Sequence, residues 1–540
     1  MKRILTFLFL ISAFTCVYAQ GIDAKTAAVF DAMEKEMART LSLSKAEPKI
    51  HFAAFKVIDL TQASVIAARG GLAQANTMSE VITDVSLRVG NNKEDNGFFD
   101  SIFFNQSAVQ EGAISPDGVR AGLWAASDTS YKKALDAYAR KQGYKNKKND
   151  EEVYDDFSRT TPAQDVKNYS KINIPLKTFK EIAQKTSAAG ALKELEKFNT
   201  YIKFGDEISY YLSNEGAKYN RQEVLITISF YAKSRTQNGF EYEDTKTLSY
   251  AALKDIPPVA ELEKIAADFA KKTASFIKAE KGTAFIGPVW LEGEASAKMF
   301  ENAFFRNINN TRKVVYDGGN GNFQYAQGEF SLKENLKVLS VNFDVVDNPL
   351  QEEFNGKKML GAYKVDDEGT PAESIYLVQN GILKDLPKTR ALIKNQKKTN
   401  GHAFVYWGRD LYAVAMVKNL FFFPHETTPV QEFKQKFMAF CKAEGLEYCY
   451  KIYSKNIAGG DILAIKINSS TGEETPVYGL KAPSLNTRTL RDIKFAADDL
   501  TLYNTPAVSY VVPSVILSEA ELTPSQKVPS TKFLVPRPNI

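Results

Sequence analysis

The sequence is short of the residues on which most hydrolytic and metal sites depend. Its 540 residues include only 3 histidines and 3 cysteines. The histidines are His51, His402 and His425, and no two of them have the spacing of an H-E-x-x-H helix. The chain also lacks a G-x-S-x-G nucleophile turn, a G-x-x-x-x-G-K-[ST] phosphate loop and a C-x-x-C pair. We therefore expect neither a complete metal site nor an activated nucleophile.

Long hydrophobic runs are absent after the first residues of the chain. Two basic residues precede the apolar residues 4–14, and Ala19 closes the segment, which is the layout of a cleaved secretory signal. The run is shorter than the roughly 20 apolar residues of a spanning helix. We predict a signal peptide over residues 1–19, a periplasmic location and no integral membrane segment. Cys16 offers an alternative, a lipid anchor, although Phe14 and Thr15 are not the small residues usual before such a cysteine.

A basic surface of the kind that binds nucleic acid is also missing. The 69 basic and 64 acidic residues are spread along the whole chain and give a net charge of +5. The densest basic stretch, residues 132–148, runs directly into three acidic residues, 150–152. A solvated helix and loop is the better interpretation of that stretch, and we expect no nucleic-acid partner.

Cysteine usage leaves one structural question open. Beyond Cys16 the chain contains only Cys441 and Cys449. In an oxidising compartment these two could form a disulfide between a helix end and the following strand. Two buried free thiols are equally compatible with the spacing, because bridging depends on the distance between the Cα atoms.

The pattern of hydrophobic residues predicts an α+β protein. The chain of 540 residues is longer than the roughly 250–300 residues that one hydrophobic core supports, and its hydrophobic content of 44% is enough for more than one core. Two domains are therefore expected. Helical spacing covers residues 24–42, 259–279 and 430–442. Alternation predicts strands at residues 49–60, 82–89, 224–232, 240–250, 337–346, 375–378, 382–386 and 447–453.

Turn residues and proline complete this plan. Asn238-Gly239 and Asn380-Gly381 supply the residues that tight hairpins require, which indicates mainly antiparallel sheets with packed helices. We place an N-terminal domain at residues 20–285 and a β-rich C-terminal domain at residues 286–522. Four prolines after Leu522 predict an extended tail over residues 523–540.

The densest acidic cluster is Asp366-Asp367-Glu368, followed by Gly369. Oxygen ligands at this spacing could hold a hard cation. Consecutive residues of an extended chain point in opposite directions, so three adjacent acids seldom converge on one ion. From the residues alone, a turn with solvated acids is the preferred interpretation.

Several segments together resemble the TldD/PmbA family of peptidases, once described as modulators of DNA gyrase. The residue stretch D-D-E-G-T-P at 366–371, then Asn380-Gly381 and N-G-H at 400–402, is similar to the family's "DDEGxP", "NGxLK" and "NGH" segments. Further similarities lie near both ends and cover nearly the whole mature chain: residues 31–39, 87–90, 95–96, 213–216, 287–304, 489–493, 498–500 and 513–522.

The resemblance implies a zinc metallopeptidase with an HExxxH helix and a cysteine ligand from a C-terminal "CGK" segment. In this sequence Phe300 and Phe305 stand at the two histidine positions, and only Glu301, at the position of the general base, matches. The region 484–521 contains no cysteine. Phenylalanine has no lone pair for zinc, so we expect Glu301 to be an ordinary helix carboxylate and the phenylalanines to fill the vacated space.

Three functions remain open at this stage. The preferred one is an exported, metal-free homologue that binds unfolded peptide or pairs with a catalytic TldD-like subunit, as a homo- or hetero-dimer. An active metallopeptidase with a rearranged site using His402, His425 or a carboxylate is the first alternative. An envelope scaffold without a peptide cleft is the second.

Overall fold

The computed structural model of the chain describes residues 21–45, 47–99, 105–148, 155–315, 327–394, 396–405, 413–452, 461–506 and 508–527. The predicted signal peptide, Cys16 and residues 528–540 of the predicted tail lie outside the described residues. The described part forms the α+β structure that the sequence predicts, with mostly antiparallel sheets. None of its helices combines the length and apolarity that crossing a membrane requires.

Six α-helices occur in the described residues. They are α1 (Ala24–Ser42), α2 (Pro116–Lys148), α3 (Leu176–Ala189), α4 (Val259–Ala274), α5 (Glu294–Ala303) and α6 (Val430–Ala443). The start of α1 is fixed by Asp23, whose side chain accepts a hydrogen bond from the Thr26 backbone N–H. α4 and α6 each begin directly after a proline, which has no N–H to leave unpaired.

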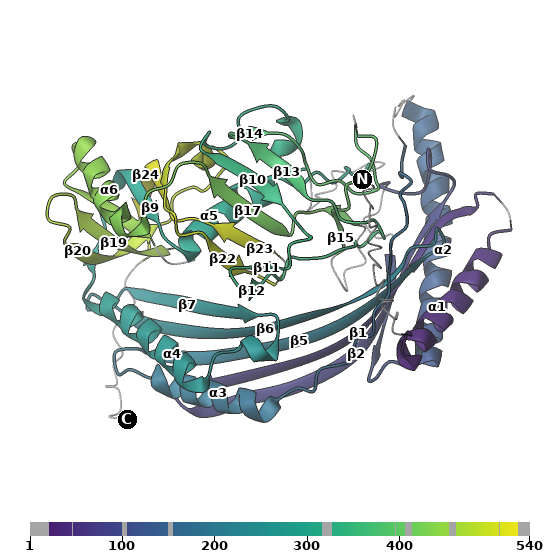
Figure 1. Ribbon diagram of the computed structural model, residues 1–540, viewed down its shortest axis with the longest axis horizontal. Helices are drawn as coiled ribbons and strands as arrows, with labels where there is room; N and C mark the ends of the chain where they lie inside the picture. Colours follow the sequence, from purple (N-terminus) through teal and green to yellow (C-terminus); the bar gives the residue numbers. More distant parts are fainter. Residues whose placement is uncertain are drawn as a thin grey trace, which may run out of the picture.

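The first sheet is long and curved and lies along the lower side of Figure 1. Its strand order is β3 (Asn105–Glu111), β2 (Gly71–Val89), β1 (Ile50–Ala68), β5 (Lys197–Ser213), β6 (Lys218–Arg235) and β4 (Gln164–Asp165). β7 (Glu241–Tyr250) also pairs with β6. Strands of 17 to 19 residues form its centre.

Among the described residues, helices cover one face of this sheet. α1 and α2 pack at one end against a core that includes Phe55, Val57 and Ile208, while α3 and α4 pack at the other end over Val65 and Ile226. The opposite face carries the alternate residues of the same strands. It faces the C-terminal half of the chain (Figure 1).

Two further sheets form the C-terminal half. The second sheet has the order β14 (Ile382–Leu383), β13 (Ile375–Gln379), β10 (Phe343–Asp347), β17 (Asn419–Pro424), β23 (Ser509–Val512) and β22 (Thr501–Asn504). The third has the order β21 (Ile493–Ala496), β24 (Val515–Pro524), β9 (Phe285–Leu291), β18 (Tyr448–Ile452), β19 (Asp461–Asn468), β20 (Glu474–Lys481) and β8 (Glu280–Lys281). Two short hairpins complete it: β11 (Glu353–Phe354) with β12 (Lys357–Lys358), and β15 (Ala403–Phe404) with β16 (Val414–Ala415).

One large hydrophobic core joins the second and third sheets to α5 and α6. β9 pairs with β24, near the end of the described chain, and with β18, which lies between them in the sequence. Sequence-distant segments therefore close this core, and α5 lies inside it (Figure 1).

Several predicted boundaries need correction. β1 extends to Ala68 and β2 begins at Gly71, so the first hairpin is much longer than the alternation at residues 49–60 and 82–89 suggested. Its distal half carries small and polar residues, which weaken the alternation signal. In the second sheet, β10 begins only at Phe343, and residues 337–342, which were predicted to belong to the strand, lie mostly outside regular strands. The last strand, β24, reaches Pro524, two residues into the predicted tail.

Candidate functional site

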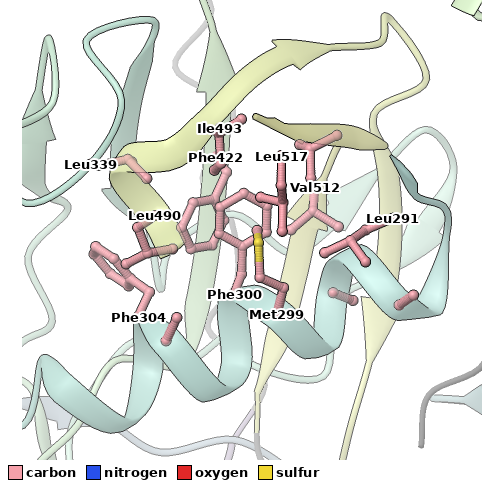
Figure 2. Packing of buried hydrophobic residues seen from close by; sticks show 14 of the residues in the cluster. Leu291, Met299, Phe300, Phe304, Leu339, Phe422, Leu490, Ile493, Val512 and Leu517 are labelled. Carbon is pink, nitrogen blue, oxygen red and sulfur yellow. The ribbon is translucent and has the colours of Figure 1, made fainter. Parts of the chain in front are cut away.

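Phe300, at the first histidine position of the family motif, is fully buried on α5. Its ring centroid lies 4.1 Å from that of Phe422 on β17 and 6.1 Å from that of Phe343 on β10. Figure 2 shows the Phe300 side chain pointing into a cluster of apolar side chains that includes Met299, Leu517 and Phe422. The space on the Phe300 side of this helix is therefore filled with hydrocarbon.

Phe305, at the second histidine position, begins the 3-10 turn η3 (Phe305–Asn307) that follows α5. It is half-buried, and its ring lies 6.1 Å from that of Tyr510 on β23. Glu301 is half-buried and forms an ion pair with Lys298, one turn earlier on the same helix. Two hydrocarbon rings and a paired carboxylate do not provide a donor set for zinc.

No alternative metal site was found among the residues that the structure describes. Within those ranges, no three His, Cys, Asp or Glu side chains are grouped as metal ligands. The three histidines lie in three different places, each beside one aspartate: His402 Nε2 is 3.1 Å from Asp347, His425 Nε2 is 3.1 Å from Asp344, and His51 Nε2 is 3.4 Å from Asp95. His402 is fully buried, and its Nδ1 lies 2.9 Å from the backbone oxygen of Asn400.

The acidic cluster forms a turn, but its acids are not solvated as the residues alone suggested. Asp366, Asp367 and Glu368 are all buried. Asp366 accepts hydrogen bonds from the backbone N–H groups of Glu368, Thr370 and Ala403, at 3.0, 2.9 and 3.1 Å. Burial and the neighbouring Glu368 raise the pKa of Asp366 to about 7, and these three N–H groups act in the opposite direction. The carboxylate thus holds the turn closed.

Gly369 lets this turn approach the first sheet. Its φ of +77° is in the left-handed region, and a Cβ at this position would lie 2.7 Å from the Cβ of Ala217. Any other residue would push the turn away from β6. Tyr219 on β6 donates a hydrogen bond of 2.8 Å to the backbone oxygen of Asp366, which fixes the same contact.

Asp367 connects the turn to the polar face of the first sheet. It forms ion pairs with Lys56 on β1, at 3.1 Å, and with Arg221 on β6, at 2.7 Å. Burial opposes ionisation of the carboxyl, yet Lys56 and Arg221 hold the pKa of Asp367 well below its usual range. Lys56 and Arg221 are far from Asp367 in the sequence, so the local sequence pattern does not indicate that Asp367 is buried and paired.

Glu368 and Arg390 form a second connection. The carboxylate of Glu368 accepts a hydrogen bond of 2.7 Å from the Arg390 backbone N–H. The Arg390 guanidinium, almost fully buried, pairs with Glu215 at 2.7 Å and lies 4.0 Å from the ring centroid of Phe157. Cation–π contact and a charged partner compensate for its burial.

Two glutamates extend the charged network along the first sheet. Glu207 on β5 lies directly opposite Glu223 on β6. Lys418 Nζ is 3.8 Å from Glu223, and Arg221 Nε is 3.4 Å from it. Burial and the adjacent Glu223 raise the pKa of Glu207 to about 7. The network contains three basic side chains, Lys56, Arg221 and Lys418, and three acidic ones, Glu207, Glu223 and Asp367.

The network around Asp367 is not predicted by the sequence patterns described above. One signal was available: Lys56, Glu207, Arg221 and Glu223 are charged residues within strands that otherwise alternate, on the face away from the helices. A charged side chain at such a position is either exposed to solvent or paired with an oppositely charged residue that is distant in the sequence.

The remaining motif residues have structural positions. Asn380 and Gly381 form the tight turn between β13 and β14, with φ of 48° and 75°. A Cβ at Gly381 would lie 2.5 Å from the Leu339 backbone oxygen, so the turn packs closely on its neighbour. Cys441 on α6 and Cys449 on β18 are joined by a disulfide.

Comparisons with known proteins agree with this arrangement. Residues 286–438 match the sequence profile of the PmbA/TldA metallopeptidase C-terminal domain. No curated protein sequence matches the chain.

Three solved structures share the fold along most of the chain. A suggested modulator of a DNA gyrase from Thermotoga maritima has a TM-score of 0.62 at 15% identity, covering 91% of this chain and 100% of its own. TldE from Thermococcus kodakarensis has a TM-score of 0.61 at 12% identity, with the same coverage. A suggested modulator of DNA gyrase from Bacteroides thetaiotaomicron has a TM-score of 0.57 at 12% identity, covering 92% of this chain and 99% of its own.

Proposed function

We propose that the chain is a metal-free, non-catalytic member of the TldD/PmbA family that binds extended, unfolded peptide. The observation that carries this proposal is the packing of Phe300. Its ring packs against core side chains, 4.1 Å from the ring centroid of Phe422, at a position where the family motif has a histidine.

Whether the motif helix could support hydrolysis depends on which of its side chains can bind zinc. A catalytic zinc needs three protein ligands, and its role is to lower the pKa of bound water to near 7. Neither Phe300 nor Phe305 can contribute a lone pair. Glu301, already paired with Lys298, then has no activated water from which to take a proton. Peptide-bond hydrolysis by the family's chemistry is not supported by these residues.

Peptide binding is supported by the edge of the first sheet. β7 pairs with β6 along one side, and no described strand pairs with its other side. Three half-buried hydroxyl residues, Thr245, Thr247 and Ser249, alternate along it. An extended peptide could add to this edge through main-chain hydrogen bonds, which recognise a backbone rather than a particular sequence.

Export and assembly belong to the same proposal. The basic residues and apolar run before Gln20 favour secretion to the periplasm. We further propose that the chain forms a dimer, either with itself or with a catalytic TldD-like subunit. Size-exclusion chromatography with light scattering tests the first case, and co-purification with a paralogue that has an intact HExxxH helix tests the second.

Metal analysis tests the non-catalytic assignment. The purified chain, dialysed against zinc and then against buffer, is measured by inductively coupled plasma mass spectrometry beside the variants His402→Ala and His425→Ala. We expect all three to retain the same small, substoichiometric amount of zinc. Stoichiometric zinc that is lost on either substitution would establish a rearranged site and overturn the proposal.

Hydrogen exchange tests peptide binding. Casein, which lacks a stable fold, is added to the chain, and amide exchange is followed by mass spectrometry. We expect protection of the peptides covering β7, residues 241–250, and none in residues 71–79 of β2, a second exposed strand segment that serves as the internal control. Equal protection of both segments would show nonspecific edge binding, and absence of protection would favour a scaffold without a peptide site.

A further inference from the structure

A cleft of about 650 Å³ lies beside α5, and its lining includes Asn302 and Arg306. Asn302 follows Phe300 by two positions, about 200° around the helix, so it projects away from the aromatic core. The cleft has the size of ordinary small-molecule sites, which occupy about 300–1,000 Å³. It uses no residue of β7 and neither phenylalanine of the motif.

One strand and one connecting segment form most of its lining. Glu519, Glu521 and Thr523 on β24 contribute one wall. The connection from β20 to the 3-10 turn η5 (Thr489–Asp492) starts at Lys481, which pairs with Thr523. It ends at Asp492, whose backbone oxygen accepts a hydrogen bond of 3.0 Å from Ser518. We call residues 482–488 the arch, because the residues that flank it, Lys481 and Asp492, contact β24 on either side of Glu519 and Glu521.

The arch is fixed by its own contacts. Thr487 donates a hydrogen bond of 2.7 Å to Glu329, and Thr489 donates one of 3.1 Å to the backbone oxygen of Ser484. Leu490, directly after the arch, is fully buried in the large core. A wall anchored in this way can present side chains to a ligand without a large ordering cost.

Charges of both signs line the cleft but do not pair with each other. The six charged lining residues are Arg306, Lys481, Arg488, Asp492, Glu519 and Glu521. None of them forms an ion pair with any residue in the described ranges. Elsewhere on the same sheet opposite charges meet directly, as Lys466 and Glu280 do at 2.7 Å.

We propose that this cleft binds a small zwitterion, a free amino acid or a short peptide, that bridges the two sets of charges. The ligand's carboxylate would be held by Arg306 and Arg488, since a guanidinium presents paired donors to a carboxylate. Its ammonium group would be held by Glu519 and Glu521, because three N–H donors match several carboxylate oxygens. A ligand with only one charge would leave one wall unused.

Isothermal titration calorimetry with triglycine tests this site on the full chain. Free glycine, N-acetyl-triglycine and triglycine amide are titrated in parallel. We expect triglycine to bind and each capped analogue to bind at least about tenfold more weakly, because each lacks one charge-assisted contact. Tighter binding of glycine than of triglycine would identify a free amino acid as the ligand type, whereas equal binding of the capped analogues would overturn zwitterion recognition.

Variants on both walls complete the test. Arg488→Gln and Glu519→Gln should each weaken triglycine binding by about tenfold or more, and the matched control Arg491→Gln, an exposed neighbour that does not line the cleft, should not. If neither wall variant changes binding, or if triglycine does not bind at all, the proposal is wrong. Casein protection of β7 should persist in both wall variants, so this site and the proposed peptide edge fail independently.

Discussion

Replacing Phe300 by alanine tests whether the motif helix has become part of a packed core. The Phe300 side chain is fully buried and contacts rings from two strands of the second sheet, Phe422 at 4.1 Å and Phe343 at 6.1 Å. The substitution removes the whole ring and leaves a cavity between α5 and β17. The surrounding residues belong to the largest core of the protein and can collapse only partly.

The expected cost can be worked out from this burial. Phenylalanine-to-alanine changes in cores lower the free energy of unfolding by about 3–5 kcal/mol. The aromatic contact with Phe422 accounts for about 0.5–1.5 kcal/mol within that loss. The matched control is Phe423→Ala, next along β17, where the side chain is 38% exposed. We expect the control to cost less than half as much, because much of its ring already contacts water.

Urea unfolding followed by circular dichroism measures both variants against the unchanged chain. The double variant Phe300→Ala, Phe422→Ala completes a cycle, in which the second substitution should cost less once the first is made. A loss below about 1 kcal/mol for Phe300→Ala would refute the reasoning. It would mean that the ring lies in a loosely filled pocket, where a ligand could still enter.

Three further predictions concern the buried charges and the disulfide. Asp367→Asn should lower the free energy of unfolding at pH 7 by about 3–5 kcal/mol, because Lys56 and Arg221 lose their buried counter-charge. Since folding lowers the pKa of Asp367, the difference in unfolding free energy between the variant and the unchanged chain should shrink as the pH falls below about 4. A difference that stays constant with pH would contradict the ion pairs. Glu207, whose pKa is raised to about 7, holds a proton in the folded chain that the unfolded chain releases above about pH 4.3, so it makes stability fall as the pH rises through 7. Glu207→Gln should therefore flatten the profile of melting temperature between pH 5 and 8, and parallel profiles would show that Glu207 titrates normally. Cys441→Ser with Cys449→Ser should lower the urea midpoint by an amount equivalent to about 2–3 kcal/mol, and non-reducing peptide mapping should find the two cysteines linked in the unchanged chain.

Local patterns allowed much of the fold to be predicted from the sequence. The helix over residues 24–42 has the observed bounds of α1, and the helix at 430–442 differs from α6 by one residue. Both Asn-Gly hairpins are confirmed by strand pairing. These elements can be predicted from short segments, because hydrophobic periodicity and turn residues are local features of the sequence. The length of the first hairpin could not be predicted, because its distal half is held by pairing with β5 and not by a local hydrophobic pattern.

Burial of the acidic turn required information that no local pattern holds. Asp367 and Lys56 are separated by 311 residues, and Asp367 and Arg221 by 146. Read alone, three adjacent acids indicate a solvated turn, since unpaired buried charges are very unfavourable. In the folded chain Lys56 on β1 and Arg221 on β6 lie beside the turn and pair with Asp367, which compensates for the burial of its charge.

The positions that match the family motifs share one physical property in this chain: they connect segments. Asp366 closes a turn through backbone hydrogen bonds, Asp367 joins that turn to β1 and β6, and the backbone around Gly381 packs on Leu339. Phe300 and Phe305 instead add apolar contacts to the core beside α5. The fold therefore accommodates phenylalanine at both motif histidine positions without losing the contacts that join its segments.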